Sequence, residues 1–252
     1  MNYNLNNPIA KRSTKTIYRD GEKAIKLFVE NYSKADILNE ALNQARVEEH
    51  TSLNIPNLIE VAKIENCWAI VSDFVEGKTL AELMEENPEK TQEYLEKMVD
   101  IQLEVLSYKV PLLNRVKDKY KRKINEADLS ENVKYELLTR LEGMKNHTKL
   151  CHGDFNPSNI VIKEDGSHHI IDWAHVTSGN ASSDVALTYL YFAMKGKEDI
   201  ASQYLTMFST KSGIDVKNIQ RWIPIVAVTK LAKASPAEKE FLNNCINVAE
   251  YQ

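Results

Sequence analysis

Glycine is scarce in this chain, with eight residues among 252, and the first of them is Gly21. No G-x-G-x-x-G motif follows a first strand, and both G-x-x-x-x-G-K-[ST] and G-x-S-x-G are missing. The zinc-binding pattern H-E-x-x-H is missing as well. These absences exclude a standard Rossmann, Walker-type or serine-hydrolase site.

Cysteine and long apolar runs are also in short supply. The three cysteines, Cys67, Cys151 and Cys245, are too few for a Cys-rich zinc site and predict free, buried thiols in a reducing compartment. No apolar run approaches the roughly 18 residues that span a bilayer. Residues 1–12 are rich in Asn and do not resemble a secretory signal. We therefore expect a cytoplasmic protein with no membrane partner.

Charge is nearly balanced, with 32 basic and 36 acidic side chains and a net charge of −4. This balance argues against a nucleic-acid or membrane-surface binder. Residues 115–123 form the one basic run. A solvated helix face is the simpler interpretation of that run, and recruitment of an anionic substrate or of nucleic acid is the alternative. The sequence does not fix the oligomeric state.

The first part of the chain has the pattern of a small sheet with one helix. Two β-rich runs, 15–19 and 23–29, are joined by Asp20-Gly21, which is typical of a hairpin. A helix is predicted to about residue 50, capped by Ser33 or Asp36. Residues 58–64 and 67–73 predict a second strand pair. We expect four or five strands in all.

After about residue 78 the pattern becomes mostly helical, so the fold class expected is α+β. The predicted helices are 79–86, 88–108, 115–124 and 130–144, followed by three or four more beyond residue 182, one of them spanning 216–233. Residues 160–163 and 168–172 interrupt the helices as a short hairpin.

The densest cluster of reactive side chains surrounds this hairpin. Asp154 is followed by Asn159 five residues later and by Asp172 thirteen residues after that. The hairpin is expected to return Asp172 to the loop that carries the other two. Mg²⁺ takes oxygen ligands, usually one or two carboxylates together with phosphates, and a further Asp can accept a hydroxyl proton. Phosphoryl transfer needs these components, and the protein-kinase catalytic loop has the same Asp-to-Asn spacing.

The segment 152–186 resembles the aminoglycoside phosphotransferase/choline kinase-like family of small-molecule kinases. The resemblance rests on His-Gly-Asp at 152–154, Asn159, Ile-Asp-Trp at 171–173, Gly179 and Asp-Val-Ala at 184–186. It implies a two-lobed protein-kinase-like fold, with a nucleotide-binding lobe over 1–77, a hinge at 73–77 and a helical lobe over 78–252 that carries the catalytic loop and the substrate site. It also implies transfer of the γ-phosphoryl group of ATP or GTP to a hydroxyl of a small molecule.

The same resemblance implies a role for each matching residue. Asp154 is then the catalytic base, and Asn159 and Asp172 are the Mg²⁺ ligands. Lys26, oriented by Glu40, holds the nucleotide phosphates, while the backbone of Asp73 and Val75 binds the purine. His152 is expected to hold the loop, and Asp184 to cap a helix beginning near residue 185 and brace that loop.

The chain departs from the family pattern at the loop that covers the phosphates. This loop, 10–15, has no glycine, and Ser13 and Thr14 are its candidate phosphate donors, with charge added by neighbouring basic residues. The glycine-free loop suggests one alternative, a catalytically weak nucleotide-binding or regulatory module. A protein kinase is a second alternative, although only eleven residues separate Asp172 from Asp184. The acceptor could be an aminoglycoside-like antibiotic or a hydroxylated metabolite. A polycationic antibiotic needs an acidic lining, for which Glu238, Glu240 and Glu250 are candidates by composition.

Overall fold

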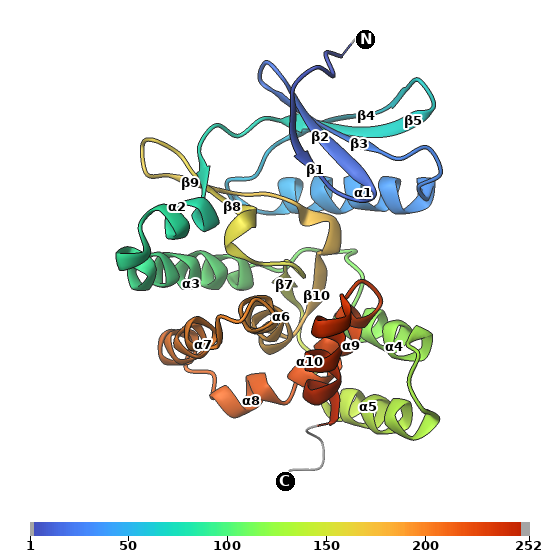
Figure 1. The fold of residues 1–252 in the computed structure, drawn as a ribbon, viewed down its shortest axis with the longest axis vertical. Coiled ribbons are helices and arrows are strands. Elements are labelled where there is room, and N and C mark those ends of the chain that lie inside the picture. The colour runs from blue at the N-terminus through green and yellow to red at the C-terminus, as the bar shows by residue number, and fades with distance from the viewer. Residues whose placement is uncertain (1–2, 248–252) are drawn as a thin grey trace. The chain divides into compact units, whose positions relative to one another are not determined.

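A computed structural model describes residues 3–247 of the chain (Figure 1). The chain divides into two compact units. The first unit comprises Met1–Pro88 with Pro157–His175, and the second comprises Glu89–Asn156 with Val176–Gln252. An antiparallel sheet dominates the N-terminal part and helices dominate the remainder, so the predicted α+β class is confirmed.

The first unit is built on a five-stranded antiparallel sheet with the order β1-β2-β3-β5-β4. Its strands are β1 (Pro8–Lys11), β2 (Lys15–Asp20), β3 (Lys23–Phe28), β4 (Leu58–Ile64) and β5 (Cys67–Asp73). The turn at Gly21 joins β2 to β3, as the Asp-Gly pair predicts. One expectation is wrong: three of the six residues of the supposed loop 10–15 lie in strands, with residues 10 and 11 at the end of β1 and Lys15 at the start of β2.

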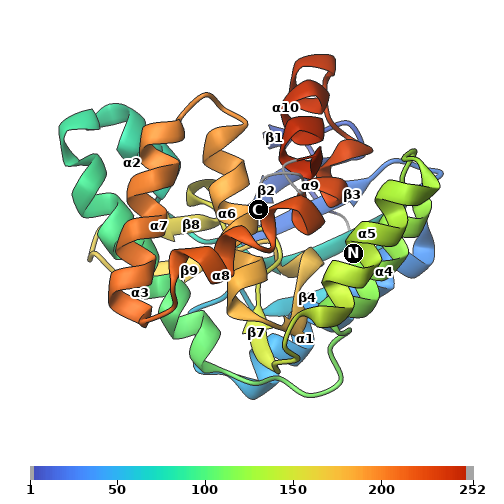
Figure 2. The ribbon, with the colours of Figure 1, turned by 90° about the horizontal axis from the view of Figure 1, so that it is seen from below.

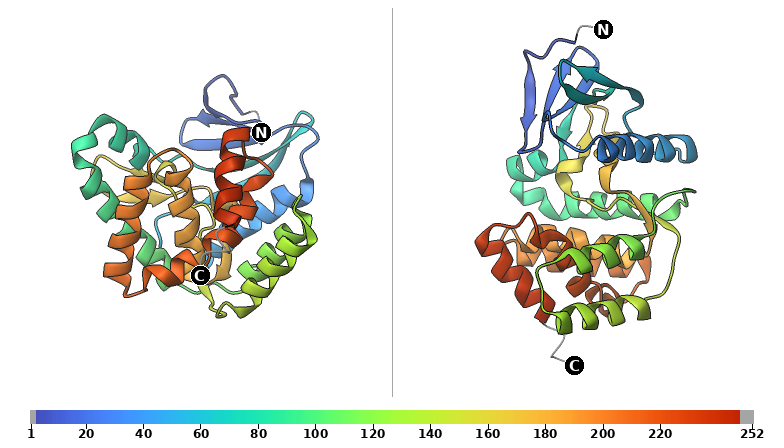
Figure 3. Two further views of the ribbon diagram at one scale, coloured as in Figure 1. Left: turned by 60° about the horizontal axis from the view of Figure 1, so that its bottom comes forward. Right: turned by 90° about the vertical axis from the view of Figure 1, so that its right-hand side faces the viewer.

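Helix α1 (Lys34–His50) packs on this sheet, as the right-hand view of Figure 3 shows. Ser33 caps it by accepting a hydrogen bond from the backbone N–H of Asp36, so Asp36 lies inside the first turn and is not the cap. Ile37 and Ala41 of the helix are buried against Phe28 and Ile70 of the sheet. This apolar contact fixes the face of α1 that is turned toward β3 and β5.

A second, three-stranded sheet with the order β6-β8-β9 completes the first unit. It consists of β6 (Lys78–Thr79), β8 (Ile160–Ile162) and β9 (His168–Ile170), flanked by α2 (Leu80–Glu86) and by the 3₁₀ helices η2 (Pro157–Asn159) and η3 (Trp173–His175). The predicted hairpin at 160–172 is therefore present, but each of its two strands ends earlier than predicted, at Ile162 and at Ile170.

The second unit is mostly helical (Figure 2). The 3₁₀ helix η1 (Pro88–Lys90) contains the boundary between the two units, which falls after Pro88. The helices of the second unit are α3 (Thr91–Ser107), α4 (Val116–Glu126), α5 (Glu131–Gly143), α6 (Ala181–Ala193), α7 (Glu198–Ser212), α8 (Val216–Gln220), α9 (Ile223–Leu231) and α10 (Pro236–Asn247). Helix α6 is buried along almost its whole length and contacts α7, α8 and α9. A helix that is buried on nearly all sides belongs in a core, and α6 lies at the core of this unit.

Two features of the second unit differ from the sequence-based expectations. The helix predicted over 216–233 is two helices, α8 and α9, with Pro224 in the first turn of α9, where a missing N–H costs no hydrogen bond. Two short strands, β7 (Lys149–Cys151) and β10 (Thr177–Gly179), pair with each other and were not predicted. Three-residue strands carry too little periodicity for a sequence pattern to reveal.

The three cysteines are free, and only Cys151 is fully buried, whereas Cys67 and Cys245 are partly exposed. Across the described residues, 3–247, no helix combines the length and the apolar character that crossing a membrane requires. Glu250, one of the acidic candidates named above, lies outside the described residues.

Candidate active site

Lys26 stands between two carboxylates in the first unit. Its Nζ lies 2.5 Å from Oε1 of Glu40 and 3.0 Å from Oδ1 of Asp172. Strand β3 supplies the lysine, α1 supplies the glutamate, and the segment after β9 supplies the aspartate. The structure therefore brings together three predicted site residues that come from three separate segments of the chain.

Burial and ion pairing set the charges in this group. Burial by itself disfavours the Lys26 ammonium, but the carboxylates of Asp172 and Glu40 outweigh it and raise the lysine pKa above its ordinary value. Burial likewise disfavours the Asp172 carboxylate, yet the ammonium groups of Lys26 and Lys15 hold the pKa of Asp172 well below its usual range. Lys26 and Asp172 are therefore both charged at neutral pH.

Asp172 has an unusual backbone. Its φ angle is +63°, in the left-handed region that side chains other than glycine rarely adopt. A strained backbone persists only where the surrounding structure holds it in place, and such residues cluster at functional sites. The β8–β9 hairpin brings Asn159 to the same place, because the N–H of Ile171 donates to the carbonyl of Asn159 at 3.0 Å. Asn159, a buried amide, thus lies opposite the residue that precedes Asp172.

Strand β2, which follows the glycine-free turn, contributes a second lysine to this group at its first residue. Lys15 Nζ lies 3.5 Å from Oδ2 of Asp172, the oxygen that Lys26 does not contact. Burial, together with the nearby Lys26, lowers the pKa of Lys15. Ser13 and Thr14 lie exposed at the turn itself. In the sequence this lysine is only one of several basic residues of the loop that could add charge.

The predicted hinge begins at the end of β5. The backbone N–H of Asp73 donates to the carbonyl of Asn57 at 3.0 Å, and its carboxylate accepts hydrogen bonds from the same asparagine. Farther along, Gly77 has a φ angle of +145°, and a side chain there would overlap the carbonyl oxygen of Ile162. This glycine permits the close approach of the chain to β8. The purine-binding roles of Asp73 and Val75 stay predictions.

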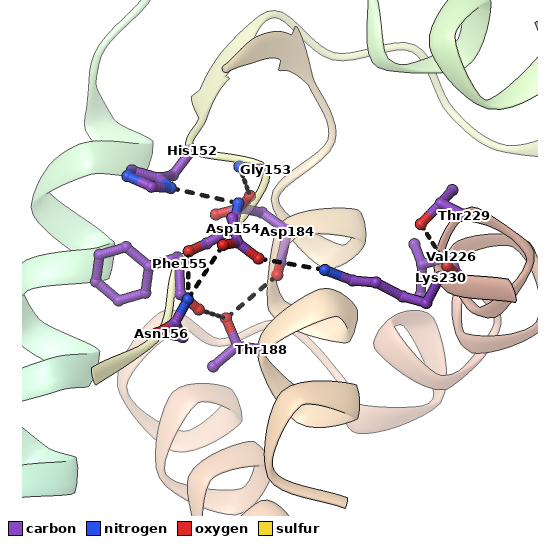
Figure 4. Close-up of polar contacts among 10 residues, drawn as sticks. All are labelled: His152, Gly153, Asp154, Phe155, Asn156, Asp184, Thr188, Val226, Thr229 and Lys230. Atoms are coloured by element: carbon purple, nitrogen blue, oxygen red, sulfur yellow. Dashed lines mark hydrogen bonds and ion pairs between the residues drawn. The ribbon is translucent and has the colours of Figure 1, made fainter. Parts of the chain in front are cut away.

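The loop that carries Asp154 lies in the second unit, where internal hydrogen bonds hold it (Figure 4). The N–H of Gly153 donates to Oδ1 of Asp184 at 2.7 Å, and the N–H of Asp154 donates to Nδ1 of His152 at 3.3 Å. His152 is fully buried and stacks edge-on against Phe155. The loop therefore has a fixed shape, with Asp154 at its tip.

Asp184 is the anchor of this loop. It is fully buried, and Gln102 donates to its Oδ2 at 3.2 Å while Gly153 occupies Oδ1. Burial raises the pKa of this carboxyl group against the opposing effects of His152 and the hydrogen bonds. The predicted capping role is wrong, because α6 begins at Ala181 and is capped by Asn180, which leaves Asp184 inside the first turn.

Two donors orient the Asp154 carboxylate. Nδ2 of Asn156 reaches Oδ2 at 3.4 Å and the Asp154 carbonyl at 2.9 Å, and Nζ of Lys230 reaches Oδ1 at 3.2 Å. Figure 4 shows the Lys230 side chain extended from α9 toward the loop. The sequence analysis missed Lys230, which is 76 residues from Asp154 and belongs to no motif.

Comparison with protein families and known proteins adds the following findings. Residues 8–216 match the sequence model of the phosphotransferase enzyme family. Comparison with curated proteins found no match. Among solved structures, a thermostable mutant of aminoglycoside phosphotransferase APH(4)-Ia is similar in its apo form, with a TM-score of 0.70, 12% identity, and coverage of 97% of this chain and 94% of that one.

Two further solved structures have the same fold. The ternary complex of a thermostable APH(4)-Ia mutant with ADP and hygromycin B has a TM-score of 0.66 and 13% identity over 96% of this chain and 91% of that chain. The GDP complex of a mutant aminoglycoside 2'-phosphotransferase-IIIa has a TM-score of 0.65 and 15% identity over 97% and 92%. These likenesses confirm the predicted kinase-like fold.

Proposed function

The chain belongs to the phosphotransferase enzyme family, and on that premise we propose that it transfers the γ-phosphoryl group of ATP or GTP to a hydroxyl group of a small molecule. The observation that carries the proposal is the group Lys26, Glu40 and Asp172 in the first unit. An ammonium held by two carboxylates at 2.5 and 3.0 Å supports phosphate binding. Phosphoryl transfer does not require a metal site built from protein ligands alone.

Nucleotide binding is assigned to the first unit. Lys26 binds the phosphates and Glu40 keeps its ammonium in place, with Lys15 as a second cation. Ser13 and Thr14 donate hydrogen bonds to phosphate oxygens from their exposed turn. The Asp73 carbonyl and the Val75 N–H bind the purine edge. A glycine-rich loop binds phosphate through backbone N–H groups that approach it closely. In this chain the charges of the two lysines take over that part of phosphate binding.

The residues present fit a magnesium ion. Asn159 and Asp172 offer one amide and one carboxylate oxygen from neighbouring positions of a rigid hairpin, the hard donors that Mg²⁺ takes alongside phosphates and water. When bound, the ion neutralises charge on the phosphate oxygens. Lys26 and Lys15 favour the ionised form of the Asp172 carboxylate.

Asp154 is assigned the part of general base. Its carboxylate accepts the proton of the acceptor hydroxyl as that oxygen attacks the γ-phosphorus. Asp184 and His152 act as positioning residues, because they hold the loop and do not meet the reacting atoms. The acceptor is a hydroxylated metabolite or an aminoglycoside-like antibiotic. Three free cysteines further support a cytoplasmic location.

The test is release of ADP or GDP by the purified protein with a panel of hydroxylated metabolites and antibiotics. Asp154→Asn is expected to lower turnover about 10²- to 10⁴-fold while thermal stability is kept. Asp128→Asn, which changes an exposed carboxylate in the loop between α4 and α5, is the matched control and should leave turnover unchanged. Unchanged turnover in Asp154→Asn contradicts the assignment of the base.

The glycine-free turn favours one alternative function, that of a nucleotide-binding module without turnover. A thermal-shift titration with Mg-ATP and Mg-GTP separates the two. Strong stabilisation by a nucleotide, together with no nucleotide consumption on any alcohol or peptide, supports the module. Phosphorylation of peptides in preference to small alcohols would instead support a protein kinase.

A further inference from the structure

Two lysines of the second unit gather beside Asp154. Lys230 on α9 contacts the carboxylate at 3.2 Å, and Lys119 on α4 lies close enough for its charge to interact with Asp154, Asp184 and Lys230. Helices α4 and α9 pack against each other, so both lysines are held by the helical core. The Lys230 and Asp154 side chains are 31% and 35% exposed, so the pair remains open to a ligand.

Lys119 occupies a place that is unfavourable for a cation. Its pKa is lowered to about 8, first by burial and then by Lys230, while the carboxylates of Asp184 and Asp154 act against the shift. A partly buried ammonium next to a second ammonium is stabilised when an anion joins them. The fold therefore holds positive charge where the proposed base lies.

The carboxylates near these lysines are already engaged. Asp184 accepts hydrogen bonds from Gly153 and Gln102, one on each oxygen. Asp154 is contacted by Lys230 and Asn156. Glu238, one of the sequence-based candidates for an acidic lining, accepts a hydrogen bond from the Ser235 N–H at the start of α10. A polycationic acceptor that placed ammonium groups beside Lys230 and Lys119 would meet like-charge repulsion.

We propose that the acceptor carries an anionic group, a carboxylate or a phosphate monoester, which Lys230 and Lys119 bind while the acceptor's hydroxyl reaches Asp154. The inference rests on the proposed function, because it takes Asp154 as the base. An ammonium group has three N–H donors, so Lys230 can contact the ligand's anion as it turns from Asp154. Its contact with Asp154 then gives way to one with the acceptor's anion.

The reaction balances with these parts. The acceptor oxygen forms a bond to the γ-phosphorus, and the bond between that phosphorus and the β–γ bridging oxygen breaks, with its electron pair leaving on the nucleoside diphosphate. The hydroxyl proton passes to Oδ1 of Asp154, the oxygen that Lys230 vacates. Lys230 keeps its own proton throughout and stays paired with the acceptor's anion.

The first experiment compares matched acceptors with the full-length protein. Polyols of three, five and six carbons are each offered in neutral, carboxylate, phosphate-ester and ammonium forms, and binding is measured by calorimetry alongside nucleotide release. We expect at least one anionic form to bind tenfold or more tightly than its neutral and ammonium counterparts. The carboxylate and phosphate arms identify which anion is recognised. Equal or better binding of neutral or ammonium forms, or no anionic preference on any scaffold, overturns the proposal.

Variants of the lysine sharpen the test. Lys230→Gln should abolish the preference for the anionic form, and Lys230→Arg should keep it. Lys233→Gln, two residues beyond the end of α9 and exposed, is the matched control and should change nothing. An anionic preference that survives in Lys230→Gln counts against the proposed contact.

The two proposals fail in different ways. If Asp154→Asn keeps full turnover, the proposed function fails. If turnover is lost in Asp154→Asn but the preferred acceptors are neutral or cationic and Lys230→Gln matches wild type, the function stands and the anionic acceptor is refuted.

Discussion

The ammonium of Lys26 contacts Oδ1 of Asp172 at 3.0 Å, although 146 residues separate the two along the chain. One belongs to a strand of the large sheet and the other follows the last strand of the small sheet. Their contact joins the proposed phosphate-binding lysine to a proposed magnesium ligand within one compact unit.

Lys26→Met should abolish nucleotide binding and also destabilise the protein. Removing the lysine leaves Glu40 and Asp172 without their shared cation, and breaking a buried pair on one side costs on the order of 3 kcal/mol. Calorimetry with Mg-ATP and urea unfolding measure the two effects. Adding Glu40→Gln to the same variant should recover part of the stability but none of the binding.

Lys63→Met is the control for that variant, since Lys63 is exposed on β4 and should affect neither property. Nucleotide affinity that is unchanged in Lys26→Met would refute the phosphate-binding role of the lysine.

The stability contributed by Asp172 should depend on pH in the acid range. Its pKa is lower in the folded chain than the ordinary value of about 3.9, so its contribution is complete well above pH 4 and declines as the pH falls below 4. Asp172→Asn should therefore be less stable than wild type at pH 7, with a difference that shrinks below pH 4. Urea unfolding between pH 3 and pH 7 measures the difference.

Glu30→Gln, at an exposed carboxylate just after β3, should show no such trend. A stability difference for Asp172→Asn that is the same at pH 3 and at pH 7 would mean that Asp172 takes no part in the ion pairs at neutral pH.

Gly77→Ala should destabilise the first unit. The added methyl group would meet the Ile162 carbonyl, and the φ angle of +145° is itself unfavourable for alanine. A cost of about 1–3 kcal/mol is expected from strain and overpacking. Gly143→Ala is the matched control, because Gly143 ends α5 with open space around it. Equal unfolding midpoints for the two variants would contradict the close approach of residue 77 to β8.

Binding of an anionic acceptor should weaken as the pH rises through about 8. The pKa of Lys119 is lowered to about 8 by burial and Lys230, against the carboxylates of Asp184 and Asp154, so Lys119 loses its charge at a lower pH than an ordinary lysine. A bound anion favours the charged form, and affinity should fall about tenfold between pH 7 and pH 9.

Lys119→Arg should flatten this dependence, because a guanidinium keeps its charge over that range. Arg122, the other cation whose charge acts on Lys119, is present in both proteins and so cannot produce the difference. An identical pH profile in the variant would exclude Lys119 as the titrating group.

Local sequence patterns predicted most elements of the fold. The strands β4 and β5 match their predicted bounds, and α1 ends at the predicted residue, because apolar periodicity and caps are properties of neighbouring residues. The errors fall on short strands that exist only by pairing with another strand. Strand β1 exists by pairing with β2, and β7 and β10 exist by pairing with each other across 25 intervening residues, 152–176.

The sequence by itself determined the family and the residues of the central motif, since the positions of Asp154, Asn159 and Asp172 along the covalent chain are given by the sequence. Only the tertiary structure decided that Asp184, which the sequence predicted both to brace the loop and to cap a helix, does only the first, and that Lys230 and Lys119 stand beside the proposed base. The reason is physical. A charge's effect depends on its distance through space and on its burial, and α4, α6 and α9 acquire both only when they pack together.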